Sequence, residues 1–177
     1  DAILQDLLSL KINAVNFPSR DYCLSEIKGY SKEYEHKRTD TLSKLLGGGF
    51  DVLTLSLDAA LQYTLPPEKL DAANFKIQSG DIIDLSTLCD RLLNSGYTRC
   101  ELCEGAGQFS LRGGIFDLYP VNCKDPVRIE FWGDEIDSIS IFDPESQRRT
   151  DSAEIIEITP AAEILYNPEK LSQTLEN

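Results

Sequence analysis

The chain has 177 residues, 41% of them hydrophobic and 27% charged, a composition typical of one soluble domain or slightly more. Thirty acidic residues outnumber 17 basic ones, so the formal net charge is −13. This balance argues against a general binder of nucleic-acid backbones, because affinity for phosphates comes from clustered Lys and Arg. No apolar run approaches the roughly 18 residues of a membrane span. A start at Asp1 inside an apolar pattern suggests a fragment of a longer chain.

Residues 1–75 are predicted to form an α/β part, because helix and strand patterns alternate there. The expected elements are a helix with Leu4, Leu7 and Leu8 on one face, a strand over 12–17, a helix over 35–46 and a strand over 51–55. Ser56 is then expected to cap a helix that runs through Gln62 and stops at Pro66-Pro67. With only two strands, which this spacing makes parallel, the part reads as a truncated domain.

Residues 76–162 are predicted to be α+β, with one helix over 84–94 followed by short antiparallel strands. The strands are expected over 97–103, 108–112, 115–119, 127–132 and 136–142, and a weaker one over 155–158. Residues 163–177 are predicted to be a linker with a closing helix over 168–175. From residue 80 onward, 8 basic residues face 19 acidic ones, so the negative charge is concentrated in this half.

The cysteines and the single histidine do not form a recognisable metal site. The five cysteines are Cys23, Cys89, Cys100, Cys103 and Cys123. An odd, scattered set indicates reduced thiols in a cytosol. Cys100 and Cys103 have zinc-ligand spacing, but no second pair exists, and a strand over 97–103 would direct them to opposite faces. His36 is expected on a solvated helix face.

No motif for catalysis or nucleotide binding is present. The sequence lacks GxSxG, HExxH and GxxxxGK[ST]. The glycines at 47–49 are followed by neither Lys-Ser nor Lys-Thr, so they are interpreted as a helix stop. This fragment is therefore predicted to have no enzymatic activity and no cofactor of its own.

Residues 127–132 (VRIEFW) carry the first candidate site. Alternation places Val127, Ile129 and Phe131 toward the core, so Arg128 and Trp132 are expected to point outward. An exposed Trp beside an Arg on a rigid sheet is typical of a protein–protein hot spot. The alternative is a Trp132 that a neighbouring loop shields.

Arg112, followed by Gly113 and Gly114, is the second candidate. In an uninterrupted strand Arg112 would share a face with the core residue Phe116. The glycines are therefore predicted to host a bulge or bend that lets Arg112 project outward. A tight hairpin with an incidental Arg is the alternative. Two arginines in an acidic segment favour a protein partner over nucleic acid, because a guanidinium can contact carboxylates in a bidentate manner.

These segments resemble a known family. Residues 108–120 (QFSLRGGIFDLYP), 127–139 (VRIEFWGDEIDSI) and 142–148 (FDPESQR) are similar to the UvrB-like module at the front of bacterial transcription-repair coupling factors. Residues 17–21, 30–38 and 51–62 resemble the preceding segment more weakly. UvrB itself shares the module, but its DNA-gripping aromatic hairpin is not evident here, which favours the coupling factors.

The resemblance implies a non-catalytic module that recruits UvrA to lesion-stalled RNA polymerase during nucleotide excision repair in the cytoplasm. Residues 1–75 would then be a partial, degenerate helicase-like domain. UvrA contact would run through Arg112, Arg128 and Trp132, with Trp where the family usually has Phe. The full-length family member is an ATP- and Mg-dependent translocase on double-stranded DNA, and its C-terminal domain is thought to mask this surface. The alternatives are a UvrB or other helicase-like DNA- or nucleotide-binding fragment, and a structural spacer.

Overall fold

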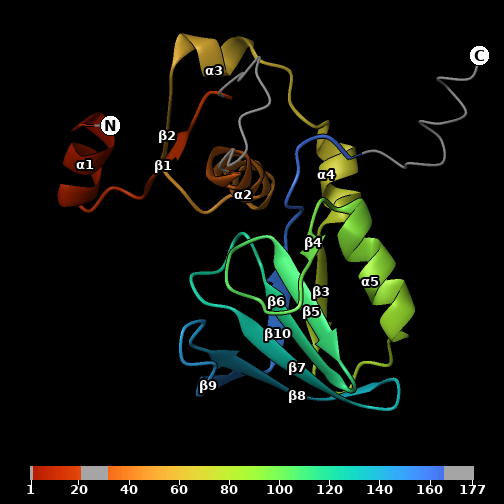
Figure 1. Cartoon of the computed structure of the whole chain (residues 1–177). Coiled ribbons are helices and arrows are strands. Elements are labelled where there is room, and N and C mark those ends of the chain that lie inside the picture. Colours follow the sequence, from red (N-terminus) through yellow and green to blue (C-terminus); the bar gives the residue numbers. More distant parts are fainter. Residues whose placement is uncertain (1, 21–31, 166–177) are drawn as a thin grey trace, which may run out of the picture.

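A computed structural model of the chain describes residues 2–20 and 32–165. Figure 1 shows a small N-terminal α/β part above a twisted antiparallel sheet, with the helix α5 alongside that sheet. The helices are α1 (Ala2–Ser9), α2 (Glu33–Gly47), α3 (Leu57–Leu61), α4 (Pro67–Ala73) and α5 (Leu85–Asn94). The strands are β1 (Ala14–Phe17), β2 (Val52–Leu55), β3 (Phe75–Gln78), β4 (Thr98–Arg99), β5 (Gln108–Arg112), β6 (Ile115–Tyr119), β7 (Val127–Trp132), β8 (Glu135–Phe142), β9 (Arg149–Ala153) and β10 (Ile155–Ile158). Within these residues no helix has both the length and the apolarity to cross a bilayer.

The N-terminal part has the parallel strand pair that its sequence pattern predicts. β1 and β2 pair in parallel, with α2 between them in the chain. Helix α2 ends at Gly47, and Gly48 follows with φ of 70°, which confirms the helix stop. The hydroxyl oxygen of Ser56 accepts a hydrogen bond from the Ala59 N–H at 3.1 Å and caps α3 as expected.

Two predictions of secondary structure between residues 62 and 107 need correction. Pro66-Pro67 does more than stop a helix, because Pro67 occupies the first turn of α4, where a missing N–H has no cost. The strand expected over 97–103 shrinks to β4, because the following loop turns back on itself. The side-chain oxygen of Gln108 accepts from the Glu104 and Gly105 N–H groups at 3.0 and 3.1 Å and fixes that loop.

The second part is a six-stranded sheet in the order β4-β5-β6-β7-β8-β9, together with an antiparallel β3–β10 pair. Apart from β4, which runs parallel to β5, all neighbouring strands in the larger sheet are antiparallel. This confirms the α+β class. The core joins α5, the β3–β10 pair and one face of the sheet. Its fully buried members include Leu92, Phe109, Phe116, Leu118 and Ile129.

Strand β9 was not expected, since its sequence RTDSA lacks apolar alternation. It pairs with β8 through its backbone at the edge of the sheet, where the polar side chains are exposed. The closing helix predicted over 168–175 falls outside the described residues.

A buried ion cluster joins the N-terminal part to the segment after β10. The carboxylate of Glu163 is fully buried, and it accepts hydrogen bonds from Arg38 Nε at 2.7 Å and Arg38 Nη2 at 3.0 Å. Arg20 Nε also donates to it at 2.9 Å. Arg38 is itself fully buried, stacks over the Phe17 ring and donates to the Pro18 carbonyl oxygen. The cluster therefore fastens α2 to the rest of the molecule.

His36 also lies at this junction, and it is half-buried rather than fully solvated as its polar surroundings in the sequence predict. Its Nε2 atom is buried and, among the residues described, has no hydrogen-bond partner. The imidazole faces Gly107, where an added Cβ would come within 2.8 Å of the ring. A helix pattern cannot reveal this contact, because Gly107 belongs to the loop before β5, 71 positions further along the chain.

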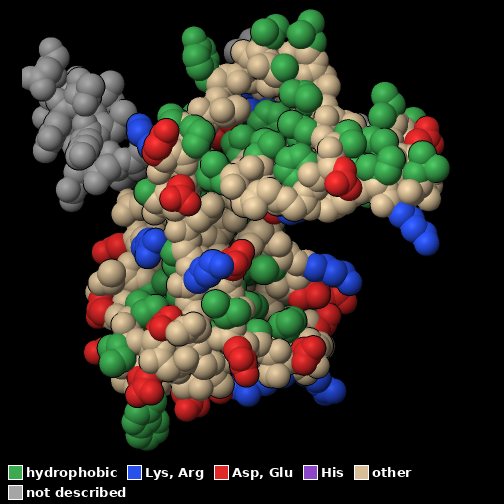
Figure 2. All heavy atoms as spheres, turned by 180° about the vertical axis from the view of Figure 1, so that it is seen from behind, with side chains coloured by type: hydrophobic (Ala, Val, Ile, Leu, Met, Phe, Trp, Pro, Cys, Tyr) green, Lys and Arg blue, Asp and Glu red, His purple; other side chains and the backbone are tan. Residues whose placement is uncertain are grey.

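Hydrophobic side chains gather over the N-terminal part in Figure 2, whereas the lower part carries scattered acidic and basic groups. Leu57, Leu61 and Tyr63 are all strongly exposed. On the face shown, the exposed apolar side chains are therefore most concentrated over the N-terminal part.

Candidate functional site

The candidate site lies on the face of the six-stranded sheet opposite the core, here called the outer face. Strand pairing brings its side chains into rows. Asp117 on β6 is opposite both Ser110 on β5 and Arg128 on β7, and Arg128 is opposite Ser140 on β8. Because the neighbours Phe116, Leu118 and Ile129 point into the core, this row points outward.

The turn between β5 and β6 decides where Arg112 points. Arg112 pairs directly with Ile115, so Gly113 and Gly114 form a two-residue hairpin loop with no bulge. Gly113 has φ of 62°, which glycine tolerates and most residues do not. The bulge interpretation is therefore wrong and the tight hairpin is correct. Arg112 still points outward, as the bulge interpretation also predicted. The hairpin puts Arg112 opposite Ile115 and leaves Phe116 in the core.

Arg128 reaches the outer face but is largely enclosed there. Its Nε donates to Asp117 Oδ1 at 2.6 Å and its Nη2 donates to Asp117 Oδ2 at 2.9 Å. The guanidinium also lies over the Phe142 ring, 4.7 Å from the ring centre. Only 15% of the side chain is exposed. Hydrogen bonding to Asp117 raises the pKa of Arg128 above its usual value, against the opposing effect of burial.

Arg112 shares the same carboxylate and is more open. Its Nη2 donates to Asp117 Oδ2 at 2.8 Å, and 51% of its side chain is exposed. The carboxylate of Asp117 is completely buried. The two arginines that the sequence singles out are thus brought together by one acidic residue between them.

Trp132 ends β7 on the same outer face and is 82% exposed. No loop in the described part of the chain shields it, so the alternative of a covered indole is wrong. Phe131 packs against the core from the opposite side of the strand and holds the backbone in place. Trp132 pairs with Glu135, and Glu135 forms a bridge to Ile82, which is also strongly exposed.

The acidic neighbours of these residues are themselves partly neutralised. Glu130 lies between Arg128 and Trp132 along β7 and forms an ion pair with Arg149. The hydrogen bond from Arg149 is the largest cause that lowers the pKa of Glu130, followed by the one that the Ser138 hydroxyl donates. Glu130 therefore stays charged but paired, and Arg112 remains the more open cation of the site.

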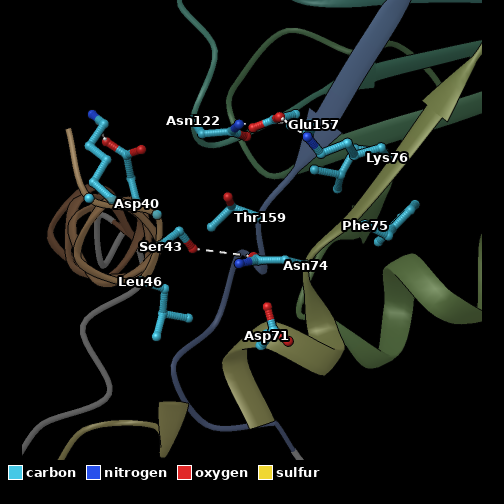
Figure 3. A pocket seen from close by; sticks show the side chains of 14 residues that line it. Asp40, Ser43, Leu46, Asp71, Asn74, Phe75, Lys76, Asn122, Glu157 and Thr159 are labelled. Atoms are coloured by element: carbon cyan, nitrogen blue, oxygen red, sulfur yellow. Dashed lines mark hydrogen bonds and ion pairs between the residues drawn. The ribbon is translucent and has the colours of Figure 1, made fainter. Parts of the chain in front are cut away.

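A second concave region lies between α2, α4 and the β3–β10 pair (Figure 3). This cleft has a volume of about 560 Å³. Several of its polar side chains bond to one another: Ser43 to Asn74 at 3.2 Å, Lys44 to Asp40, and Lys76 to Glu157. These internal pairs give the cleft the character of a junction between the two parts of the molecule.

The cysteines do not converge on a site. Cys103 is buried against the β5–β6 end of the sheet, and burial raises its pKa to about 12, with the Asp117 charge acting in the same direction. Among the residues described, no group of three or more His, Cys, Asp or Glu could hold a metal ion. Cys23 lies outside the described residues.

Asp117 is the site residue that reasoning from sequence missed. It looks like an ordinary outward residue between two core positions, Phe116 and Leu118. The signal was present in the spacing, because an outward acid on β6 must face an outward residue on each neighbouring strand. Only the register decides that this residue on β7 is Arg128.

The fold and the outer face define a class: a small α+β domain whose sheet presents two paired arginines and a bare tryptophan, the composition of a protein-docking surface. Residues 75–164, about half of the chain, match the family model described as the UvrB interaction domain. The chain therefore belongs to the UvrB interaction domain family.

Similar proteins agree with this assignment. The transcription-repair-coupling factor of Bacillus subtilis (strain 168) is 34% identical over 177 residues, which cover 98% of this chain and 15% of that protein. Those of Staphylococcus aureus (strain USA300) and Staphylococcus epidermidis (strain ATCC 35984) are 32% and 33% identical, over 90% and 91% of this chain and 14% of theirs. The chain thus spans about one seventh of the length of these relatives.

Proposed function

We propose that this chain is the UvrA-binding module of a transcription-repair coupling factor, and that it docks UvrA through Arg112, Arg128 and Trp132 on the outer face. The observation that carries the proposal is the 82% exposure of Trp132 on a strand whose opposite side is fixed in the core. A large, rigid and bare aromatic residue next to arginine is what binding hot spots contain. The match to the UvrB interaction domain and the names of the relatives support UvrA as the partner.

The charge of the molecule supports a protein partner rather than nucleic acid. Both arginines are tied to Asp117, and the surrounding half of the chain is strongly acidic. Non-specific binding to DNA needs several unpaired cations along the phosphate backbone. A protein surface with matching polar and apolar areas meets the outer face at a smaller electrostatic cost.

The wider role is part of the same proposal. In the cytoplasm, the module would recruit UvrA to RNA polymerase stalled at a lesion, during transcription-coupled nucleotide excision repair. ATP hydrolysis, translocation on double-stranded DNA and contact with RNA polymerase would belong to other parts of the full-length protein, as would masking of the surface by a C-terminal domain. Residues 1–75 would be the partial helicase-like domain, 76–162 the UvrA-binding domain and 163–177 the returning linker.

Titration calorimetry of the purified chain with purified UvrA tests the proposal. Saturable binding that Trp132→Ala weakens supports it, whereas no heat of binding at micromolar concentrations contradicts it. Tyr63→Ala is the matched control, because Tyr63 is 93% exposed but lies in the N-terminal part. An ATPase assay and a salt-dependent DNA titration of the same sample test the helicase-like and DNA-binding alternatives, and both are expected to show no activity.

A further inference from the structure

One buried carboxylate sets the geometry of both site arginines. Asp117 has no exposed side-chain surface, and three guanidinium N–H groups donate to its two oxygens over 2.6 to 2.9 Å. A buried carboxylate is costly unless it is paired and hydrogen-bonded. Here both requirements are met by the residues that the proposed function assigns to docking.

The pairing leaves much of Arg112 facing solvent. An arginine side chain offers five N–H donors in a planar fork. The described contacts use one of these donors on Arg112, and half of the side chain is exposed. Arg128 is held more completely, by Asp117, by the Phe142 ring below it and by Gln147 beside it. The two cations are therefore oriented before any partner arrives.

Pre-orientation matters because ordering a long side chain costs free energy on binding. Each rotamer-rich side chain immobilised at an interface opposes association, and rigidifying it beforehand removes that cost. Asp117 also lowers the net charge of the trio to +1. The negative charge of Asp117 should therefore weaken the electrostatic attraction of the site to an acidic partner. The fixed arginine geometry should strengthen binding, so the two effects change the affinity in opposite directions.

We propose that Asp117 is a positioning residue of the docking surface, which aligns Arg112 and Arg128 for the partner without contacting the partner itself. The inference rests on the proposed function, since it assigns a role in the binding of UvrA. It goes beyond that function because it makes binding depend on a buried, negatively charged residue, whereas the arginines that would contact the partner are positively charged.

Asp117→Asn tests the proposal, because it keeps the side-chain shape and removes the charge. We expect UvrA affinity, corrected for the folded fraction, to fall about tenfold as two arginine side chains lose their fixed geometry. This loss should occur although the surface becomes more positive. Unchanged or tighter binding by this variant, alongside normal binding by the wild type, would overturn the inference and leave the proposed function intact.

A double-mutant cycle separates positioning from general destabilisation. Asp117→Asn and Arg112→Ala should be strongly non-additive in binding, whereas Asp117→Asn and Trp132→Ala should be additive, because Trp132 has no described contact with Asp117. Two controls belong to the cycle. Ser110→Ala alters the buried neighbour opposite Asp117 and should not change affinity. Glu163→Gln breaks the other buried arginine cluster, and it should lower stability and leave affinity unchanged.

NMR hydrogen exchange tests the positioning of Arg128 without UvrA and without a variant that must fold. In the free wild-type chain, the Nε–H signal of Arg128 should exchange slowly with water, because it donates to Asp117 at 2.6 Å. Exchange as fast as that of exposed Arg99 would overturn the inference even if Asp117→Asn does not fold. Failure of the wild-type chain to bind UvrA would overturn the proposed function and this inference together.

Discussion

Two regions of the molecule contain the same kind of buried carboxylate–arginine cluster, but the clusters differ in what they connect. In each, one fully buried carboxylate holds two arginines: Glu163 holds Arg20 and Arg38, and Asp117 holds Arg112 and Arg128. In the first cluster Arg38 is completely buried, and it donates from all three of its nitrogen atoms to protein oxygens. In the second, half of the Arg112 side chain faces solvent.

The difference lies in what each carboxylate connects. Glu163 reaches partners 125 and 143 positions away in the sequence and closes the molecule between α2 and the segment after β10. Asp117 reaches partners 5 and 11 positions away, on the strands that flank it. A cluster that spans the fold contributes to global stability, whereas one within a single sheet can shape a surface. Of the four arginines in the two clusters, Arg112 is the one with half of its side chain exposed to solvent, against 22% for Arg20.

The largest expected effect is on the Glu163 cluster. Glu163→Gln leaves the buried Arg38 without a counter-charge, and breaking a buried pair from one side costs about 3 to 5 kcal/mol. Urea unfolding followed by circular dichroism should show this loss in the free energy of unfolding. Glu157→Gln is the control, because Glu157 pairs with Lys76 on the surface and should cost less than about 1 kcal/mol. Equal effects of the two variants would contradict a special role for the junction.

Arg128→Ala should affect both binding and stability, in contrast to Glu163→Gln. We expect UvrA binding to weaken by about 2 kcal/mol or more, the range of central hot-spot residues. Stability should fall as well, because Asp117 stays buried with only Arg112 as its ionic partner. Calorimetric binding and thermal unfolding of one sample measure both quantities.

The matched control for this variant is Arg99→Ala. Arg99 is exposed on β4, where it pairs with the core-facing Phe109 and lies near the Cys89 thiol of α5, so it belongs to the other face of the sheet. It should retain wild-type affinity. Equal binding by Arg128→Ala and the wild type would remove Arg128 from the site.

Trp132→Ala should weaken UvrA binding without lowering stability, unlike Glu163→Gln and Arg128→Ala. The indole is exposed and packs little, so its removal should cost more than about 1 kcal/mol in UvrA affinity with no measurable change in melting temperature. Trp132→Phe keeps an aromatic ring at this position, and it should recover most of the affinity. A fall in melting temperature for Trp132→Ala would instead indicate a structural role.

Local features of both regions could be predicted from sequence. The alternation of residues 127–132 correctly separates Val127 and Ile129 from Trp132, and the expected cap at Ser56 appears as its hydroxyl oxygen accepting from the Ala59 N–H at 3.1 Å. Each of these follows from a period or a cap within a few residues. The face of the sheet toward which each β7 side chain points can therefore be predicted from these six residues.

Register and long-range contact could not be predicted. Asp117 becomes a partner of Arg128 only through the pairing of β6 with β7, and Glu163 meets Arg38 only through the closure of the fold. The polar strand β9 has no hydrophobic alternation because it lies at the edge of the sheet with its polar side chains exposed, so neither of its faces is buried. The sequence alone does not choose between a bulge and a hairpin at Gly113 and Gly114, since either one can reset the alternation of side chains.

His36 gives the smallest expected effect and tests the junction near Glu163. Burial is the main cause that lowers the pKa of His36 in the folded protein, with Lys32 acting in the same direction and Glu33 opposing it. The unfolded chain binds the proton at the ordinary pKa of about 6.5. Between that pH and the lower folded pKa, the unfolded state therefore holds more protons, so stability is complete above about pH 6.5 and falls on acidification.

His36→Asn removes the titrating group and keeps a polar side chain of similar size. At pH 8 the variant and the wild type should differ only by local packing against Gly107. On lowering the pH to 5, the wild type should lose more unfolding free energy than the variant, because only the wild type has an imidazole whose partial burial opposes protonation. Taking the difference between the two proteins cancels the carboxylates that titrate in both. A parallel decline of the two stability curves would contradict the partial burial of His36 against Gly107.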